Sequence, residues 1–508
     1  MTVTERPRGR IASLRRRYEP KIAALRGSDT AKAAGLALAM IANNVIALGS
    51  TIVFARLLTD YGSLAALISY FLILSVAGQA IQVATAREGV LGRLGVGPGL
   101  IATLKRWTWS LLWVTLAMTV VAILLRQPTA DLVGVRRDPW AAAIGLPAGC
   151  LWLELCFLRG ALQGVGDYRS VGISLIGEQS TRLVSGAALA LAGLGVTGAY
   201  LGTPISFIVM GLYCARQLRR YVEGLAVAEP TRQRVSEAVE AMALHPEPVP
   251  EFAAALDRTP APAAIGATST RSRGPGPSPG PGPTPTPAAS PSPAPALSLG
   301  THVKRAWAPI AGLIVIAVLQ NIDLIAAKHR LSGPVDNSYA ATAVAAKVLI
   351  WVAIGSGFYL VPEVSRRRAN GEDPRPVLAV ALGIILVCAV PVLLIFGFAA
   401  KPLLRLGFGS NHLRAVDSLL VLGVAFTVLA GTYLAIQYML ALKRTWFLLV
   451  IGAVAIAEPV LLLQASRKPA GFAAVVLGVQ AIGALLAFAW ALRRDNAPPA
   501  AAASPEPA

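Results

Sequence analysis

Long apolar runs constrain this chain more than any other feature of its sequence. About a dozen stretches of roughly 20 apolar residues follow one another, and each is long enough to cross a hydrocarbon core as a helix. A soluble protein would instead spread its apolar residues at helical or strand periodicity, with polar residues on the opposite face. A mean hydropathy of +0.61 agrees with this interpretation. The sequence therefore predicts an all-α polytopic membrane protein.

The runs form two groups of six. The first group covers about residues 31–55, 62–85, 107–125, 139–163, 168–193 and 196–215. The second group covers about residues 306–327, 339–361, 377–400, 415–442, 446–465 and 470–492. We expect a basic cytoplasmic arm, a first lobe, a Pro-rich disordered linker, a second lobe and a disordered tail, because composition changes at these boundaries. These five parts cover residues 1–30, 31–220, 221–300, 301–494 and 495–508.

Lysine and arginine are distributed unevenly around the runs. With the N-terminus placed in the cytoplasm, the cytoplasmic segments hold 27 of these residues, Arg159 among them, and the outer segments hold 11. Positive charge on short loops marks the cytoplasmic side. We therefore expect a multi-pass protein of the cytoplasmic (inner) membrane with both termini inside. Much of the net charge of +20 then reflects topology and contact with anionic membrane lipids, and nucleic acid is not expected as a partner.

An even number of spans in each half lets both halves enter the membrane from the same side. The halves can then be related as parallel repeats, an arrangement found in several transporter classes. Two segments support such a repeat, since Tyr61 precedes Arg87 by 26 residues and Tyr339 precedes Arg366 by 27. The predicted architecture is about 12 transmembrane helices in two pseudo-symmetric six-helix lobes.

Catalytic motifs are not found between the runs. The longest outer loops, 126–138 and 401–414, hold few acidic residues and no carboxylate pair for acid–base chemistry. A Walker-type phosphate-binding motif and a histidine pair at metal-ligand spacing are both missing from the sequence. We therefore expect a protein that is not an enzyme, without a metal site or a cofactor, and interpret the chain as one that moves a substrate across the membrane.

Charged side chains inside the spans are costly and usually face a bundle interior or a water-filled cavity. Glu178 and Arg182 stand four residues apart, hence on one helix face. This pair either lines a cavity or is a neutralised structural pair. Asp323 and Lys347 lie in neighbouring spans of the second half, where a structural salt bridge and a substrate or ion site are equally open. Gln320 shares the helix face of Asp323.

Three further residues complete the candidate set. Asn44 is a polar residue of the first span, and hydrogen bonding between helices is the alternative role for it. Glu154 and Glu458 are isolated carboxylates, one in each half, and either could be a protonatable coupling site. Because Glu458 precedes Pro459, marking a helix kink is the alternative role for it.

Three stretches carry a resemblance to a known family. They are TIVFARLLTDYGSLAALISYFLILSVAGQAIQVATARE (51–88), RGALQGVGDYRSVGISLIGEQSTRLVSGAALALAGLGVTGAYLG (159–202) and NIDLIAAKHRLSGPVDNSYAATAVAAKVLIWVAIGSGFYLVPEVSRR (321–367). They resemble the polysaccharide-flippase branch of the multidrug/oligosaccharidyl-lipid/polysaccharide (MOP) exporter superfamily. The likeness covers both lobes, and it does not cover the linker or the termini.

The resemblance implies two lobes that rock around a central cavity. It also implies a polyprenyl-(pyro)phosphate-linked oligosaccharide or envelope-polysaccharide precursor as substrate, with Arg182 and Lys347 as cations for the pyrophosphate. The long linker departs from the family pattern and adds envelope glycan-assembly proteins as candidate partners. Two alternatives stay open: a drug/cation antiporter of the same superfamily, and a non-transporting scaffold for envelope-polysaccharide enzymes.

Overall fold

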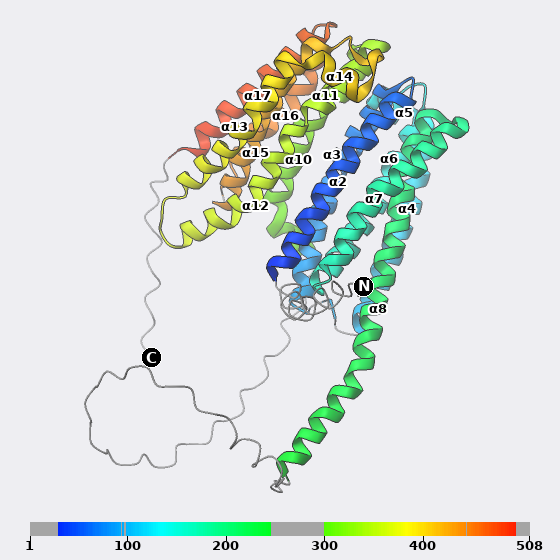
Figure 1. Cartoon of the computed structure of the whole chain (residues 1–508), viewed down its shortest axis with the longest axis vertical. Coiled ribbons are helices and arrows are strands. Elements are labelled where there is room, and N and C mark those ends of the chain that lie inside the picture. The colour runs from blue at the N-terminus through cyan, green and yellow to red at the C-terminus, as the bar shows by residue number, and fades with distance from the viewer. Residues whose placement is uncertain (1–28, 93, 96–97, 245–298, 443, 494–508) are drawn as a thin grey trace, which may run out of the picture. The chain divides into compact units, whose positions relative to one another are not determined.

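A computed structural model describes residues 29–92, 94–95, 98–244, 299–442 and 444–493, which contain helices and no strand (Figure 1). The helices of the first half are α2 (Asp29–Leu57), α3 (Tyr61–Val90), α4 (Pro98–Leu124), α5 (Arg126–Val133), α6 (Pro139–Gly164), α7 (Tyr168–Leu189) and α8 (Gly195–Leu244). Those of the second half are α10 (Leu299–Arg330), α11 (Pro334–Ala346), α12 (Val348–Ala369), α13 (Arg375–Phe398), α14 (Ala400–Phe408), α15 (Leu419–Ala441), α16 (Phe447–Gln464) and α17 (Pro469–Ala491).

Twelve membrane spans can be counted in these described ranges. Ten helical stretches are long and apolar enough to cross a membrane, and one of them, Tyr168–Gly224, holds two spans. Its two helices, α7 and α8, meet at a π-helical turn (Ala190–Leu194) in which Gly193 has a φ of 96°. Helices α11 and α12 together form the twelfth span, which is broken at Lys347. The expected arrangement of six plus six spans is confirmed.

The two halves repeat the same pattern of packing. The second span packs on the fourth in each half, as α3 on α6 and α12 on α15, and the first packs on the fifth, as α2 on α7 and α10 on α16. A short helix also follows the third span in each half: α5 in the first and α14 in the second. Both short helices lie at the same end of the two lobes, where α5 packs on α10 and α14 packs on α2 (Figure 1).

Local sequence explains where several helices begin and how closely they pack. Asp60 and Asp167 each open a D-Y-x-S motif, and each accepts a hydrogen bond from the backbone N–H three residues later, which caps α3 and α7. Where α3 crosses α6, a Cβ on Gly160 would lie 2.5 Å from the carbonyl oxygen of Gln82. Small residues allow this close approach of two backbones within a membrane.

The parts outside the lobes are described only in part. Helix α8 continues to Leu244, so the first section of the expected linker, 221–300, is helical. Residues 223–244, the described part of that section, belong to a unit separate from the one that contains both lobes. The rest of the linker, the basic arm and the tail lie almost entirely outside the described residues.

Candidate functional site

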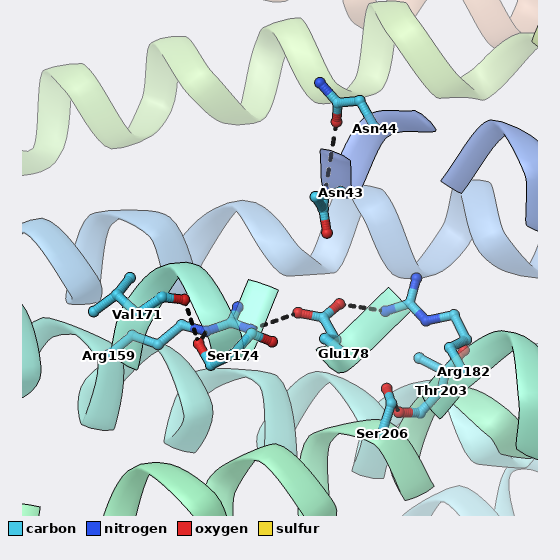
Figure 2. Close-up of polar contacts among 9 residues, drawn as sticks. All are labelled: Asn43, Asn44, Arg159, Val171, Ser174, Glu178, Arg182, Thr203 and Ser206. Carbon is cyan, nitrogen blue, oxygen red and sulfur yellow. Dashed lines mark hydrogen bonds and ion pairs between the residues drawn. The ribbon is translucent and has the colours of Figure 1, made fainter. Parts of the chain in front are cut away.

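The first lobe contains a buried row of charges centred on Glu178 of α7. One carboxylate oxygen of Glu178 lies 2.7 Å from Nη2 of Arg182 on the same helix, and the other lies 3.0 Å from Nη2 of Arg159 on α6. Figure 2 shows the three side chains in line, with the carboxylate between the two guanidinium groups. The contact of Glu178 with Arg182 follows from their i, i+4 spacing. We call this set the Arg–Glu–Arg cluster.

Arg159 corrects an expectation drawn from the charge count. It was assigned to a cytoplasmic segment, but its side chain is fully buried in α6 and donates from Nε to Ser174 Oγ and from Nη2 to the Ser174 carbonyl, both at 2.8 Å. The range predicted for this span, 139–163, already contained Arg159, so the sequence carried a signal for a buried arginine. Moving one charge leaves the excess on the cytoplasmic side in place.

Aromatic rings surround both guanidinium groups of the cluster. Arg182 lies 5.4 Å from the ring centre of Phe207, and Arg159 lies 5.7 Å from that of Trp152. The cluster holds two positive charges and one negative charge. Among the described residues, Nη1 of Arg159 and Nε of Arg182 are buried and have no hydrogen-bond acceptor. A site with one surplus cation and free N–H donors is suited to an anion.

The second lobe contains a cluster of opposite sign. Lys347 stands at the break between α11 and α12, and its Nζ lies 2.9 Å from Oδ1 of Asp323 on α10. The predicted contact between these two residues is therefore present. Glu458 on α16 is fully buried nearby, and its Oε1 accepts a 3.0 Å hydrogen bond from Nε2 of Gln480 on α17. We call these four residues the Asp–Lys–Glu cluster, which holds two carboxylates and one ammonium group.

Sequence reasoning missed Gln480, whose partner Glu458 is 22 residues away on another helix. Its amide N–H groups also reach the Leu319 carbonyl at 3.0 Å, so this side chain links α16 and α17 to α10. A buried glutamine in an otherwise apolar run was the available signal. The break at Lys347 was also missed, because the sequence contains no proline or glycine in the 12 residues before it.

Three predicted residues are not in either cluster. Asn44 is half-buried on α2, and its Oδ1 lies 3.5 Å from Nδ2 of Asn43, at the limit for a hydrogen bond. Figure 2 shows both asparagines apart from the Arg–Glu–Arg cluster. Gln320 and Glu154 are also half-buried. Their proposed roles as cavity or coupling residues therefore rest on the sequence alone.

The two lobes are joined at the end that carries α5 and α14. Lys328 on α10 bridges the lobes, because its Nζ lies 2.7 Å from Asp60 at the start of α3 and 3.0 Å from Asp336 on α11. Asn337 donates to the Thr59 carbonyl at 2.7 Å and accepts from the Gly62 N–H at 2.8 Å. These contacts join the lobes at one end, and we call them the outer contact because the charge distribution of the sequence predicts that this end faces outward.

In the outer contact Lys328 stabilises the charged form of Asp60, and Gly62 lies close to Asp336. Burial alone would raise the pKa of Asp60, but the hydrogen bond and charge of Lys328 outweigh it, so the pKa of this carboxyl lies below its ordinary value of 3.8. A Cβ on Gly62 would stand 1.9 Å from Oδ2 of Asp336. A larger residue at this position would push the Asp336 carboxylate away from its place beside Lys328. In the described part of the chain, no group of three or more His, Cys, Asp or Glu side chains is placed to hold a metal ion.

Comparison with known proteins shows which solved structures share this fold. No family model and no curated protein sequence matches the chain. Among solved structures, an inward-facing multidrug-resistance MATE family transporter of the MOP superfamily aligns with a TM-score of 0.60 and 12% identity, over 88% of this chain and 93% of that one. The lipid II flippase MurJ in an inward closed conformation aligns with a TM-score of 0.60 and 12% identity, over 90% and 87%.

A third structure, a mutant of the Vibrio cholerae MATE transporter VcmN, aligns with a TM-score of 0.51 and 15% identity, over 92% of this chain and 98% of that one. The three structures agree on the architecture over most of the chain. The fold expected from the resemblance, that of the MOP exporter superfamily, is confirmed.

Proposed function

We propose that this chain, which has the fold of the MOP exporter superfamily, is a transporter and not an enzyme, and that it flips an amphiphile with an anionic headgroup across the cytoplasmic membrane. The Arg–Glu–Arg cluster carries the proposal. It places a surplus positive charge and two unsatisfied guanidinium nitrogens inside a membrane-spanning lobe. A charge within a membrane-spanning segment is costly, and charges in such places usually belong to a substrate or ion site.

The chemistry of the cluster favours a phosphate or pyrophosphate. A guanidinium group offers a planar set of donors that matches phosphate oxygens in pairs, and bonds between charged partners are the strongest of this kind. Each carboxylate oxygen of Glu178 pairs with Nη2 of one guanidinium and thereby fixes its orientation. An incoming anion then meets donors that are already aligned, and it neutralises the remaining charge.

A lipid-linked oligosaccharide is the substrate class that fits this site best. Its (pyro)phosphate would interact with Arg159 and Arg182 of the first lobe, its sugar would pass between the lobes, and its polyprenyl chain would stay among membrane lipids. MurJ, a lipid II flippase, shares the fold. The outer contact fits alternating access, because its few polar bonds can break and re-form as the lobes rock. The charge distribution supports cytoplasmic termini.

A drug/cation antiporter is the second candidate, and one observation favours it. The Asp–Lys–Glu cluster has a surplus carboxylate, as a cation-coupled carrier requires, and MATE transporters share the fold. The Arg–Glu–Arg cluster argues against a cationic drug, because it would repel one. A scaffold that recruits envelope enzymes through the linker would need neither cluster.

Reconstitution tests the function directly. Full-length protein in liposomes is given a fluorescent polyprenyl-pyrophosphate glycan, and flipping is followed by loss of the label that a membrane-impermeant quencher or reductant can reach. We expect Arg182→Gln to slow flipping, and Arg126→Gln to match the wild type, since Arg126 lies on the outer helix α5. Equal rates for all three proteins would refute the assignment, and uptake of a cationic dye in place of the glycan would support the antiporter.

A further inference from the structure

The first span of each lobe ends one residue after a side chain with a nitrogen donor. This residue is Arg56 in α2 of the first lobe and His329 in α10 of the second. Arg56 donates from Nε to the Gly407 carbonyl at 3.0 Å and from Nη2 to the Leu406 carbonyl, both in the last turn of α14. Nε2 of His329 lies 2.9 Å from the Leu132 carbonyl in the last turn of α5. Because a carbonyl oxygen only accepts, His329 donates this bond.

The carbonyl groups at the end of α5 take donors from outside the helix, because the last turn of a helix has no N–H groups of its own for them. Gly134 and Val135 donate back to two of these carbonyls, and His329 supplies the donor for Leu132. Gly134 has a φ of 84°, and a Cβ at this position would lie 3.0 Å from Cγ of Lys328. The glycine therefore ends α5 and also lets α10 approach closely enough for His329 to reach it.

The end of α14 is completed in the same way from the first lobe. The Gly409 N–H donates to the Arg405 carbonyl at 3.1 Å, and Nδ1 of His412 donates to the Phe408 carbonyl at 3.0 Å. The two carbonyls between them accept from Arg56. A guanidinium group offers several donors in one plane, and a positive charge is favourable at the C-terminus of a helix. Arg56 therefore caps α14 both by hydrogen bonding and by charge.

We infer that the two lobes exchange helix caps at this end: each lobe completes the short helix of the other, and both caps are lost when the lobes separate. We call the bonds of Arg56 to α14 and of His329 to α5 the crossed caps. Arg56 and His329 occupy equivalent positions in the two lobes, as do α14 and α5. One interaction thus occurs twice, and a single separation of the lobes breaks both copies.

The crossed caps differ from the outer contact in what their loss does to the chain. The carboxylates and Lys328 of the outer contact can each turn to water when they part. The carbonyls freed at the ends of α5 and α14 belong to the backbone, and a helix end without its cap unwinds more readily. Separation of the lobes therefore loosens the last turns of both short helices, which links local order in two outer segments to the closure of this end. The inference rests on the proposed function only in that transport separates the lobes here.

Hydrogen–deuterium exchange of the full-length protein in nanodiscs tests the crossed caps without any substrate, so its outcome is independent of whether glycan is flipped. We expect Arg56→Met to speed amide exchange in the last turn of α14 by about 5-fold and to leave α5 nearly unchanged. His329→Ala should speed exchange in α5 and leave α14 nearly unchanged. Arg56 and His329 are both exposed, so neither substitution disturbs the core.

The matched control for this measurement is Arg414→Met, which removes an exposed charge at the same end and should change exchange in neither helix. Exchange that rises equally in α5 and α14 for either variant overturns the inference, because the substitution would then only loosen the lobes. Unchanged exchange in both helices overturns it as well.

Distance measurements test the link to lobe separation. Nitroxide labels are attached at Arg137→Cys in the first lobe and Ser410→Cys in the second, two exposed positions near this end, in a background without the native cysteines. With Arg56→Met and His329→Ala combined, we expect double electron–electron resonance to show an added population at longer distance. A distance distribution identical to that of the labelled protein with intact crossed caps shows that these bonds do not hold the lobes together, and it overturns the inference.

Discussion

The two buried charge clusters occupy equivalent places in the two lobes and differ in sign. Each is built on a glutamate of the fifth span, the eleventh residue of α7 in one lobe and the twelfth residue of α16 in the other. Glu178 is held between two arginines, whereas Glu458 shares one lysine with Asp323. One scaffold, repeated, thus supports a positive site and a negative site. The first lobe therefore has a surplus of buried positive charge, and the second a surplus of buried carboxylate.

The largest expected difference concerns the two glutamates. Glu178→Gln leaves two buried arginines without a counter-charge and should destabilise the protein by about 3–5 kcal/mol. Glu458→Gln resembles the protonated acid and should change stability by about 1 kcal/mol or less, since its hydrogen bond to Gln480 can be kept. Thermal unfolding in detergent micelles measures both variants. Equal losses of stability would show that the two clusters do not differ in kind.

Transport should separate the cations of the two clusters. A hydrogen bond to a charged group contributes about 1.5–3 kcal/mol, so Arg182→Gln should slow glycan flipping by about 10-fold or more. Arg182→Lys keeps the charge and loses the planar donors, so its flipping rate should fall between those of the wild type and Arg182→Gln. Lys347→Gln should change the apparent affinity for substrate less than Arg182→Gln does, because Lys347 is already paired with Asp323. A large loss of affinity in Lys347→Gln would instead place the headgroup in the second lobe.

The ion pair of Asp323 and Lys347 in the second lobe can be tested by itself. Asp323→Asn and Lys347→Met each leave an unbalanced charge, and the double variant removes both charges. Residues in direct contact show coupling energies of about 0.5–3 kcal/mol, so the double variant should be more stable than the sum of the single effects indicates. Urea unfolding of the four proteins gives this coupling. Strict additivity would argue that Lys347 does not depend on Asp323.

The outer contact should give the smallest effect, because Asp60 is about one-third exposed. Lys328→Met should increase maleimide labelling of a cysteine at Thr59 by a few-fold, in a background without the native cysteines, while leaving the stability of both clusters unchanged. Since the pKa of Asp60 is lowered in the closed state, its contribution is present above pH 3.8 and lost as the outer pH falls below it. Maleimide labelling at neutral pH that Lys328→Met leaves unchanged would show that the outer contact does not hold the lobes together.

Local sequence predicted much of the architecture and part of the site. Apolar run length fixes which segments span the membrane, and the i, i+4 spacing of Glu178 and Arg182 places them on one face wherever α7 packs. The neighbouring spans of Asp323 and Lys347 made their contact a reasonable expectation. Polarity is the one sequence signal for Asn44, Gln320 and Glu154. Polarity does not determine which direction a side chain faces in the bundle.

Tertiary structure decided the sign and the membership of each cluster. Arg159 reaches Glu178, and Gln480 reaches Glu458, only because two helices pack in one register, and helix register depends on the fit of side chains along the whole contact. The contact of Lys347 with Asp323 and the meeting of Asp60 with Lys328 across the lobes likewise depend on how the helices pack. By itself the sequence determined a twelve-span membrane protein with charged residues inside its spans. The reason is that a run of about 20 apolar residues can cross the membrane as a helix whichever helices it packs against. Which charges neutralise one another depends on distances of a few ångströms, and these exist only in the folded chain.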